Sequence, residues 1–253
     1  MSTDNSSVES SAYLDLIKRL ITNYAYLGGD DTFAAFNPFR QYNIEAQKWL
    51  IDPQSRPMTL LSIGQLEMIQ NAVIDIERRN IRGDFIEAGI WRGGAIIFMR
   101  ALVKAYDIGQ RQIIAADSFE GIPQNVTFRH DPVDTWQDRW SASLEEVQGN
   151  IKRVGLLDDR IEFLPGFFAD SLGAMANRNF ALVRLDSDSY ESVMTSLEHL
   201  YPRLSPGGIV IIDDWHLIGC RFAVDAYRKQ HGITEEIVAR DGNAFWIKYD
   251  ASV

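Results

Sequence analysis

The sequence predicts an α/β fold in which helices cover both faces of a mostly parallel, twisted sheet. Helix-like and strand-like segments alternate from about residue 62 onward. Two of the strand-like segments, residues 180–186 and 208–213, are nearly all apolar, as strands buried on both faces are. Several of these strands end in an acidic residue. Together these observations favour a parallel sheet with a ligand site at one edge.

The composition is that of a globular protein. The chain has 253 residues, 46% of them apolar, and its 25 basic and 35 acidic side chains give a net charge of −10. This acidity repels phosphate backbones, so nucleic-acid binding is not expected. The single cysteine, Cys220, excludes an intrachain disulfide framework and a thiolate metal cluster. Without a membrane-length apolar run or a signal-peptide pattern, we expect a cytoplasmic protein with no membrane partner.

The N-terminal part differs in character from the rest. Residues 13–21 carry apolar side chains at helical spacing, and residues 28–57 form an aromatic loop region. We therefore expect a helical and lid segment over residues 1–60, and a main domain over residues 61–253.

The main domain begins with a predicted helix cap. Ser62 and Gln65 have the spacing of a capping box, and apolar residues on one face of the following helix extend to Ile76. The further elements are predicted in chain order. Strands are expected at 84–87, 112–117, 160–164, 180–186, 208–213, 235–239 and 244–249, and helices at 94–106, 144–154, 190–204 and 219–230.

Acidic residues stand at the ends of four predicted strands. They are Glu87, Asp117, Asp186 and Asp213. In open parallel sheets, ligands bind outside the carboxyl ends of the strands. These four acids are therefore candidate site residues.

The turn after the first of these strands contains Gly89, Gly93 and Gly94. Such a turn lets backbone approach a ligand, although a purely structural tight turn is the alternative. Its pattern, G-x-x-x-G-G after an acid, differs from the dinucleotide fingerprint. The acid would repel a pyrophosphate but suits an ammonium group, and Asp117 suits the two hydroxyls of a ribose. The pattern favours a nucleoside with an amino-acid tail, S-adenosylmethionine.

Two aspartate pairs follow neighbouring apolar strands. Asp186 and Asp188 flank Ser187, and Asp213 precedes Asp214. Carboxylates gathered in one pocket disfavour ionisation unless a hard divalent cation, most commonly Mg²⁺, relieves the repulsion. The alternative is that Asp188 and its serine neighbours only cap the next helix. The second pair favours the metal site.

Other candidates have less support from their surroundings. His216 lies two residues past Asp214 and is either an acid–base group or a wall residue. Phe128, Trp136 and Trp140 form either an apolar lid or a packed loop. Cys220 has no evident base partner and is expected to be a packing residue.

Six strings of sequence contain these residues. They are DFIEAGIWRGGA (84–95), ADSFEGIP (116–123), LPGFF (164–168), RLDSDSYES (184–192), YPRLSPGG (201–208) and IDD (212–214). They resemble the macrocin O-methyltransferase (TylF-like) family, and the similarity runs from about residue 58 to 247. The resemblance implies a Rossmann-like class I methyltransferase fold, the cofactors S-adenosylmethionine and Mg²⁺, and methylation of sugar hydroxyls on macrolides or other glycosylated natural products. It also suggests a homo-oligomer, a dimer or larger.

The resemblance assigns roles to individual positions. It implies that Asp186, Asp213 and Asp214 bind the metal and that Asp188 is the general base. Cofactor contacts are implied for Thr59, Leu60, Glu87, Ala88, Gly89, Ile90, Trp91, Asp117, Ser118, Phe119, Gly121, Ser143, Gly166, Phe167 and Asp186. Two features depart from the family: Ser187 replaces a common glycine, and residues 1–57 have no clear match.

The predicted reaction joins these roles. Mg²⁺ chelates two neighbouring hydroxyls of a deoxyhexose, Asp188 takes a proton, and the oxygen attacks the sulfonium methyl group. A catechol-type acceptor would suit the same acids. A glycosyltransferase that uses Asp186-Ser187-Asp188 for a metal-bound sugar nucleotide is an alternative from another class, and a non-catalytic binding module is a third.

Overall fold

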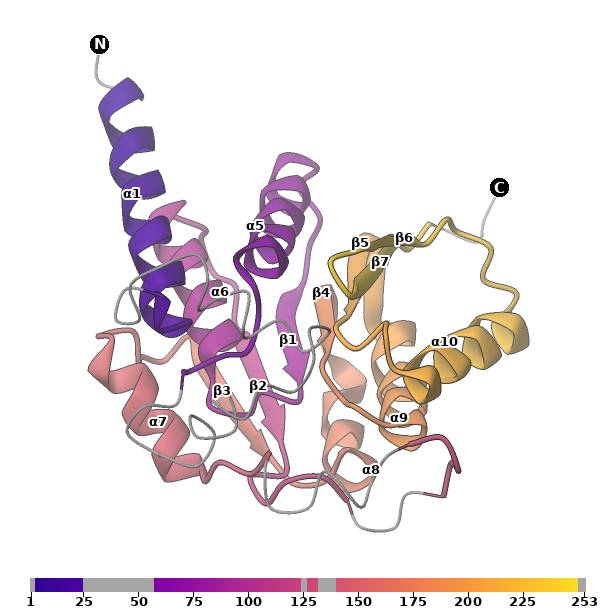
Figure 1. Cartoon of the computed structure of the whole chain (residues 1–253). Coiled ribbons are helices and arrows are strands. Elements are labelled where there is room, and N and C mark those ends of the chain that lie inside the picture. The colour runs from indigo at the N-terminus through magenta and orange to yellow at the C-terminus, as the bar shows by residue number, and fades with distance from the viewer. Residues whose placement is uncertain (1–2, 25–56, 124–126, 132–139, 250–253) are drawn as a thin grey trace.

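A seven-stranded sheet with the order β3-β2-β1-β4-β5-β7-β6 forms the centre of the molecule (Figure 1). The computed structural model describes residues 3–24, 57–123, 127–131 and 140–249. Strands β1 to β5 are parallel, and β7 runs antiparallel to both of its neighbours. The bounds are β1 (Asp84–Ala88), β2 (Ile113–Asp117), β3 (Ile161–Pro165), β4 (Phe180–Leu185), β5 (Leu204–Ile212), β6 (Val238–Arg240) and β7 (Asn243–Ile247). The predicted mostly parallel α/β sheet is confirmed.

Helices cover both faces of this sheet. One face carries α1 (Thr3–Ile21), α5 (Ile63–Arg78), α6 (Gly94–Ala105) and α7 (Leu144–Arg153). The other carries α8 (Phe168–Ser171), α9 (Tyr190–Leu200) and α10 (Ile218–His231). Short 3₁₀ helices span Leu172–Asn177 and Tyr201–Arg203.

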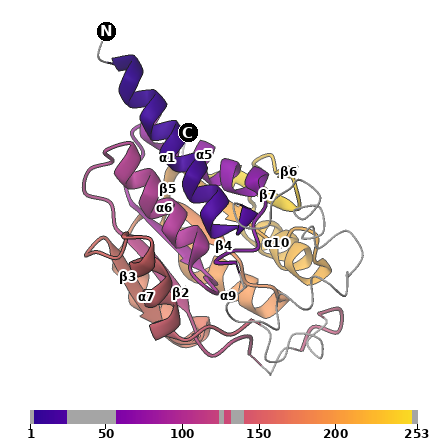
Figure 2. The ribbon, with the colours of Figure 1, turned by 60° about the vertical axis from the view of Figure 1, so that its left-hand side comes forward.

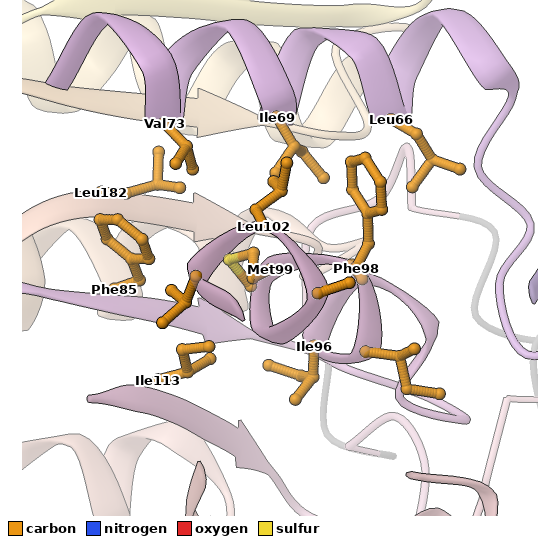
Figure 3. Close-up of a cluster of buried hydrophobic side chains, with 14 of the residues drawn as sticks. Leu66, Ile69, Val73, Phe85, Ile96, Phe98, Met99, Leu102, Ile113 and Leu182 are labelled. Atoms are coloured by element: carbon orange, nitrogen blue, oxygen red, sulfur yellow. The ribbon is translucent and has the colours of Figure 1, made fainter. Parts of the chain in front are cut away.

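The two faces have separate apolar cores because side chains alternate along each strand. In β1, Phe85 belongs to the core under α5 and α6, and its neighbour Ile86 belongs to the core under α9 and α10. Figure 3 shows the first core, where Ile69 of α5 and Leu102 of α6 point into the space above the sheet. Both cores fix β1 and β4 in the middle of the sheet.

Helix α5 begins where the sequence predicts. The Gln65 backbone N–H donates to Ser62 Oγ at 3.1 Å, and the Ser62 N–H donates to Gln65 Oε1 at 2.7 Å. These reciprocal bonds satisfy donors that a helix start otherwise leaves unpaired. The capping box is confirmed.

The first helix lies along α6 on the outside of the molecule (Figure 2). It starts at Thr3, ten residues before the predicted pattern, and buries Leu14, Ile17 and Ile21 in the core that α5 and α6 share. The predicted aromatic lid region lies almost wholly outside the described residues. In the described part of the chain, no helix is both long enough and apolar enough to span a membrane.

Candidate active site

The ends of the central strands bring the predicted residues side by side. Hydrogen bonding continues one residue past each strand: the N–H groups of Gly89, Asp186 and Asp213 donate to Ala116, Ala88 and Leu185 carbonyls, each at 2.9 Å. The loops after β1, β4 and β5 therefore leave the sheet together. Ala88, a predicted cofactor contact, also accepts a bond from Ser187 Oγ at 3.3 Å.

The glycine turn comes into direct contact with the loop after β4. Gly89 has φ +90°, and a Cβ atom built on it would lie 1.6 Å from the carbonyl oxygen of Asp186. Only glycine fits this position, because both the φ angle and the space exclude a side chain. The turn thus places Gly89, a predicted contact of the methyl donor S-adenosylmethionine, against Asp186, a predicted metal ligand.

Asp117 holds the rest of this turn. Its Oδ2 accepts the N–H groups of Ile90 at 2.8 Å and Trp91 at 3.2 Å, and its Oδ1 accepts the Phe119 N–H at 2.8 Å. Burial raises the pKa of Asp117, and these bonds oppose the rise. Ser118 Oγ also lies 3.4 Å from Oδ1, although it is closer to the Gly121 carbonyl, at 2.7 Å. A carboxylate offers about four acceptor positions, so Asp117 has room for one ribose hydroxyl at most.

The other predicted cofactor residues lie on the loops after β2 and β3 and at the start of α7. Ser118 Oγ donates to the Gly121 carbonyl at 2.7 Å, and the Gly166 N–H donates to the Asp117 carbonyl at 2.9 Å. Phe167 directly precedes α8. Ser143 is an exposed helix cap that accepts the Glu146 N–H at 3.2 Å, which is a structural role.

Thr59 and Leu60 follow a residue that binds the start of α6. The Gly94 N–H donates to the Met58 carbonyl at 2.8 Å, and a Cβ atom on Gly94 would lie 2.5 Å from Thr59 Cβ. The segment before α5 is therefore fixed against the glycine turn.

Arg184 is a central residue that the sequence analysis missed. Its fully buried guanidinium pairs with Glu87, with Asp186 at 3.0 Å and with Asp213 at 2.6 Å. The available signal was a lone arginine inside the apolar strand β4. Burial raises the pKa of Glu87 to about 7, against the opposing attraction of Arg184. One oxygen of Glu87, Oε1, is thus already paired with Arg184.

Three carboxylates gather beside this arginine. One oxygen each from Asp186, Asp188 and Asp214 lies within 4.8 Å of the others, a spacing that a metal ion can bridge. Asp188 has φ +55°, and its N–H donates to Asp214 Oδ2 at 3.3 Å. Burial and neighbouring acids raise the pKa values of all three well above the usual range.

This group differs from the predicted ligand set in one residue. Asp213 was expected with Asp186 and Asp214, but its Oδ1 pairs with Arg184, and Asp188 takes its place in the group. Arg184 pairs with both Asp213 and Asp186, and Asp186 also belongs to the carboxylate group, so this acid links the arginine to the group.

Among the buried polar atoms without a hydrogen-bond partner within the described residues, two lie on β1 and the glycine turn. They are Glu87 Oε2 and Trp91 Nε1, both on the strand and turn predicted to hold the donor. An unpaired buried acceptor costs free energy unless a ligand satisfies it. Glu87 Oε2 fits a cationic group such as an ammonium.

The structure also shows where the less strongly supported candidates lie, apart from Trp136. Cys220 is fully buried, as expected for a packing residue. His216 lies at the surface, and partial burial lowers its pKa. Of the proposed lid aromatics, Trp140 contacts Trp91 edge-on with centroids 6.0 Å apart, Phe128 stacks on Tyr190, and Trp136 lies outside the described residues.

Comparison with known proteins assigns this architecture to a family. The model of the macrocin-O-methyltransferase (TylF) family matches residues 10–248. The mycinamicin III 3''-O-methyltransferase of Micromonospora griseorubida is 40% identical over 242 residues, 90% of this chain and 92% of that protein. A tetracenomycin rhamnosyl 4'-O-methyltransferase of Streptomyces olivaceus is 38% identical over 242 residues, 92% and 91% of the two chains. The solved O-methyltransferase NovP has a TM-score of 0.80 and 34% identity, covering 95% of this chain and 99% of that chain.

Proposed function

Because the chain belongs to the macrocin-O-methyltransferase (TylF) family, we propose that it methylates a deoxysugar hydroxyl of a glycosylated natural product, with S-adenosylmethionine as donor and Mg²⁺ as activator. The protein is an O-methyltransferase, and family membership replaces the glycosyltransferase and binding-module alternatives. The two curated relatives named above act on sugars of antibiotics, which supports a sugar acceptor here.

The observation that carries the proposal is the contact between the glycine turn, which is predicted to bind the methyl donor, and the carboxylate group, which is predicted to bind the metal. Gly89 of the glycine turn touches the backbone of Asp186, whose carboxylate belongs to the group with Asp188 and Asp214. A donor on the turn and an acceptor at the carboxylates would therefore meet. Positioning two reactants in this way can contribute about 7–11 kcal/mol to the barrier reduction.

The carboxylate group fits a hard divalent cation. Its three acids lie close together, and such like charges are stable in the ionised state only with a counter-charge. We assign Asp186 and Asp214 to the metal. Asp213 would contribute through the oxygen that Arg184 does not occupy. When bound, Mg²⁺ would supply the acidification of a sugar hydroxyl, and S-adenosylmethionine would supply the methyl group.

Asp188 is then the general base. A carboxylate is a weak base toward a free alcohol, so it works only on an acidified hydroxyl. Asp188 would accept the hydroxyl proton, and the donor, when bound, would supply its methyl group to the sugar oxygen and leave as a neutral thioether. The left-handed backbone of Asp188 and its bond to Asp214 hold the carboxylate beside the other two acids.

The test combines binding with turnover. Thermal unfolding is measured with S-adenosylhomocysteine, with and without Mg²⁺, since a ligand of the folded state raises the unfolding temperature. Methyl transfer is measured on rhamnosylated and deoxyallosylated macrolides beside a catechol. We expect transfer to a glycoside that EDTA abolishes. Full activity in EDTA would refute the metal step, and transfer to the catechol alone would establish the phenolic alternative.

Matched variants separate the two roles. Asp188→Asn should keep the Mg²⁺-dependent stabilisation and lose turnover, whereas Asp214→Asn should lose both. Asp225→Asn, on the exposed side of α10, is the control and should change neither. If Asp188→Asn lost the Mg²⁺ effect and Asp213→Asn kept it, Asp188 would be a ligand.

A further inference from the structure

A further buried acid, Asp131, has no role in the mechanism above. Asp131 is 8% exposed and belongs to the described segment 127–131. Its Oδ2 accepts the N–H of Tyr190, the first residue of α9, at 2.8 Å. A carboxylate at this position stabilises a helix start by accepting an otherwise unpaired donor and by facing the positive end of the helix dipole.

The same carboxylate packs against the first turn of α10. A Cβ atom built on Gly219 would lie 1.9 Å from Asp131 Oδ1, so this acid occupies the space that a side chain at residue 219 would need. Oδ1 is buried there and has no hydrogen-bond partner within the described part of the chain. Burying an unpaired carboxylate oxygen costs free energy. An apolar side chain could fill the same space without that cost, so Asp131 has a role beyond filling space.

The rest of the segment binds α9 as well. Glu191 Oε1 accepts the Thr127 N–H at 2.9 Å, the Thr127 hydroxyl at 2.6 Å and the Phe128 N–H at 3.0 Å. Phe128 stacks on Tyr190 with ring centroids 4.9 Å apart and planes at 13°. The segment is thus attached to the start of α9 at both of its ends.

Both helices begin directly after the reacting carboxylates. Tyr190 comes two residues after Asp188, and α10 begins at Ile218, four residues after Asp214. We propose that Asp131 is a positioning residue that joins the N-terminal ends of α9 and α10 and so sets the separation of Asp188 and Asp214. This inference rests on the proposed function, because it assumes that those two acids act together.

Four variants test it: Asp131→Asn, Asp131→Ala, Gly219→Ala and the double variant Asp131→Ala/Gly219→Ala. The asparagine keeps an oxygen for the Tyr190 N–H, so its turnover should remain within about threefold of the parent. Asp131→Ala removes the oxygen that accepts the Tyr190 N–H and should lower kcat about tenfold to 100-fold, since small misplacements of reacting groups have effects of this size. The KM for S-adenosylmethionine should stay within about threefold, because Asp131 does not touch the glycine turn.

The glycine variant gives the decisive comparison. A methyl group at Gly219 displaces Asp131, so Gly219→Ala should reproduce the loss seen in Asp131→Ala. In the double variant the methyl group meets no carboxylate, so its kcat should match that of Asp131→Ala rather than fall by the product of the two effects. Gly149→Ala, in α7 with open space around its Cβ position, is the control for glycine replacement.

The Mg²⁺-dependent rise in unfolding temperature is read in the same proteins. The half-saturating Mg²⁺ concentration should increase severalfold in Asp131→Ala and Gly219→Ala, with folding checked by circular dichroism. Unchanged kcat and Mg²⁺ response in Asp131→Ala, or additive losses in the double variant, would overturn the proposal. If the parent itself shows no Mg²⁺ response, the metal step of the proposed function fails, and kcat alone then decides the role of Asp131.

Discussion

Replacing Arg184 with methionine removes the cation that three carboxylates share. The guanidinium is fully buried and pairs with Glu87, with Asp186 at 3.0 Å and with Asp213 at 2.6 Å. Methionine has a similar length but no charge, so the variant buries acids without their partner. Removing one partner of a buried ion pair typically costs about 3–5 kcal/mol. Protonation of the abandoned acids keeps the cost near that range, although three of them are involved.

The loss is measurable as a change in the free energy of unfolding. In a chain of this size, 1 kcal/mol lowers the unfolding temperature by about 2–4 °C, so we expect a decrease of about 6–20 °C. Urea titrations followed by circular dichroism, without Mg²⁺ and near neutral pH, give the free energy directly. The loss should become smaller as the pH falls below about 7, because burial raises the pKa values of Glu87 and Asp186 and these acids then take up protons.

Arg78→Met is the matched control. Arg78 also pairs with an acid, Asp75, at 2.7 Å, but its side chain is 77% exposed. Exposed pairs contribute about 0–1 kcal/mol, so this variant should lie within about 1 kcal/mol of the parent. Equal losses in the two variants, or a loss below about 1 kcal/mol for Arg184→Met, would refute the view that buried charge pairing holds the strand ends together.

Three further predictions concern Glu87, Gly89 and Cys220. The pKa of Glu87 is raised by burial from 4.5 to about 7, so the folded protein binds a proton that the unfolded chain releases in this window. The free energy of unfolding of the metal-free protein should therefore fall as the pH rises from about 4.5 through about 7, by up to about 3 kcal/mol. In urea titrations, the free energy of unfolding of Glu87→Gln should depend less steeply on pH. Equal pH dependence in the parent and the variant would contradict this. Gly89→Ala should abolish the S-adenosylhomocysteine-dependent rise in unfolding temperature, because its Cβ would collide with the Asp186 carbonyl at 1.6 Å, whereas Gly149→Ala should gain up to about 1 kcal/mol of stability. Burial raises the pKa of the Cys220 thiol well above its ordinary value, so iodoacetamide should alkylate it only after unfolding, as mass spectrometry can show.

Local patterns predicted the fold because each one follows from short-range physics. The capping box at Ser62 and the apolar runs of β4 and β5 depend on neighbours in the chain, and the capping box and β4 lie where the sequence indicates. The prediction for β5 was wrong at its start, because Leu204 continues the helical spacing of the preceding segment but is the first residue of the strand. The short helix α8 was missed, since four residues carry no periodic signal. The order of the strands depends on packing between distant segments, so local patterns did not predict it.

The candidate site shows the same division. The strand-end acids were predictable because a parallel sheet must bring its carboxyl ends to one edge. The sharing of Arg184 by Glu87, Asp186 and Asp213 was not predictable, because it depends on how three strand ends meet, and only the folded geometry places Asp188 with Asp186 and Asp214. The role of Asp131 was also not predictable from the sequence. It depends on contacts with Tyr190 and Gly219, which lie 59 and 88 positions further along the chain.

The glycine turn and the carboxylate group both include contacts of Asp186, so the binding of a ligand at one affects the binding of a ligand at the other. Gly89 touches the backbone of Asp186, and Arg184 pairs on one side with Glu87 of the donor strand and on the other with Asp186. Moving Asp186 therefore disturbs both the turn and the charge balance of Glu87. A change that improves the fit of one ligand at the expense of this contact would weaken the binding of the other.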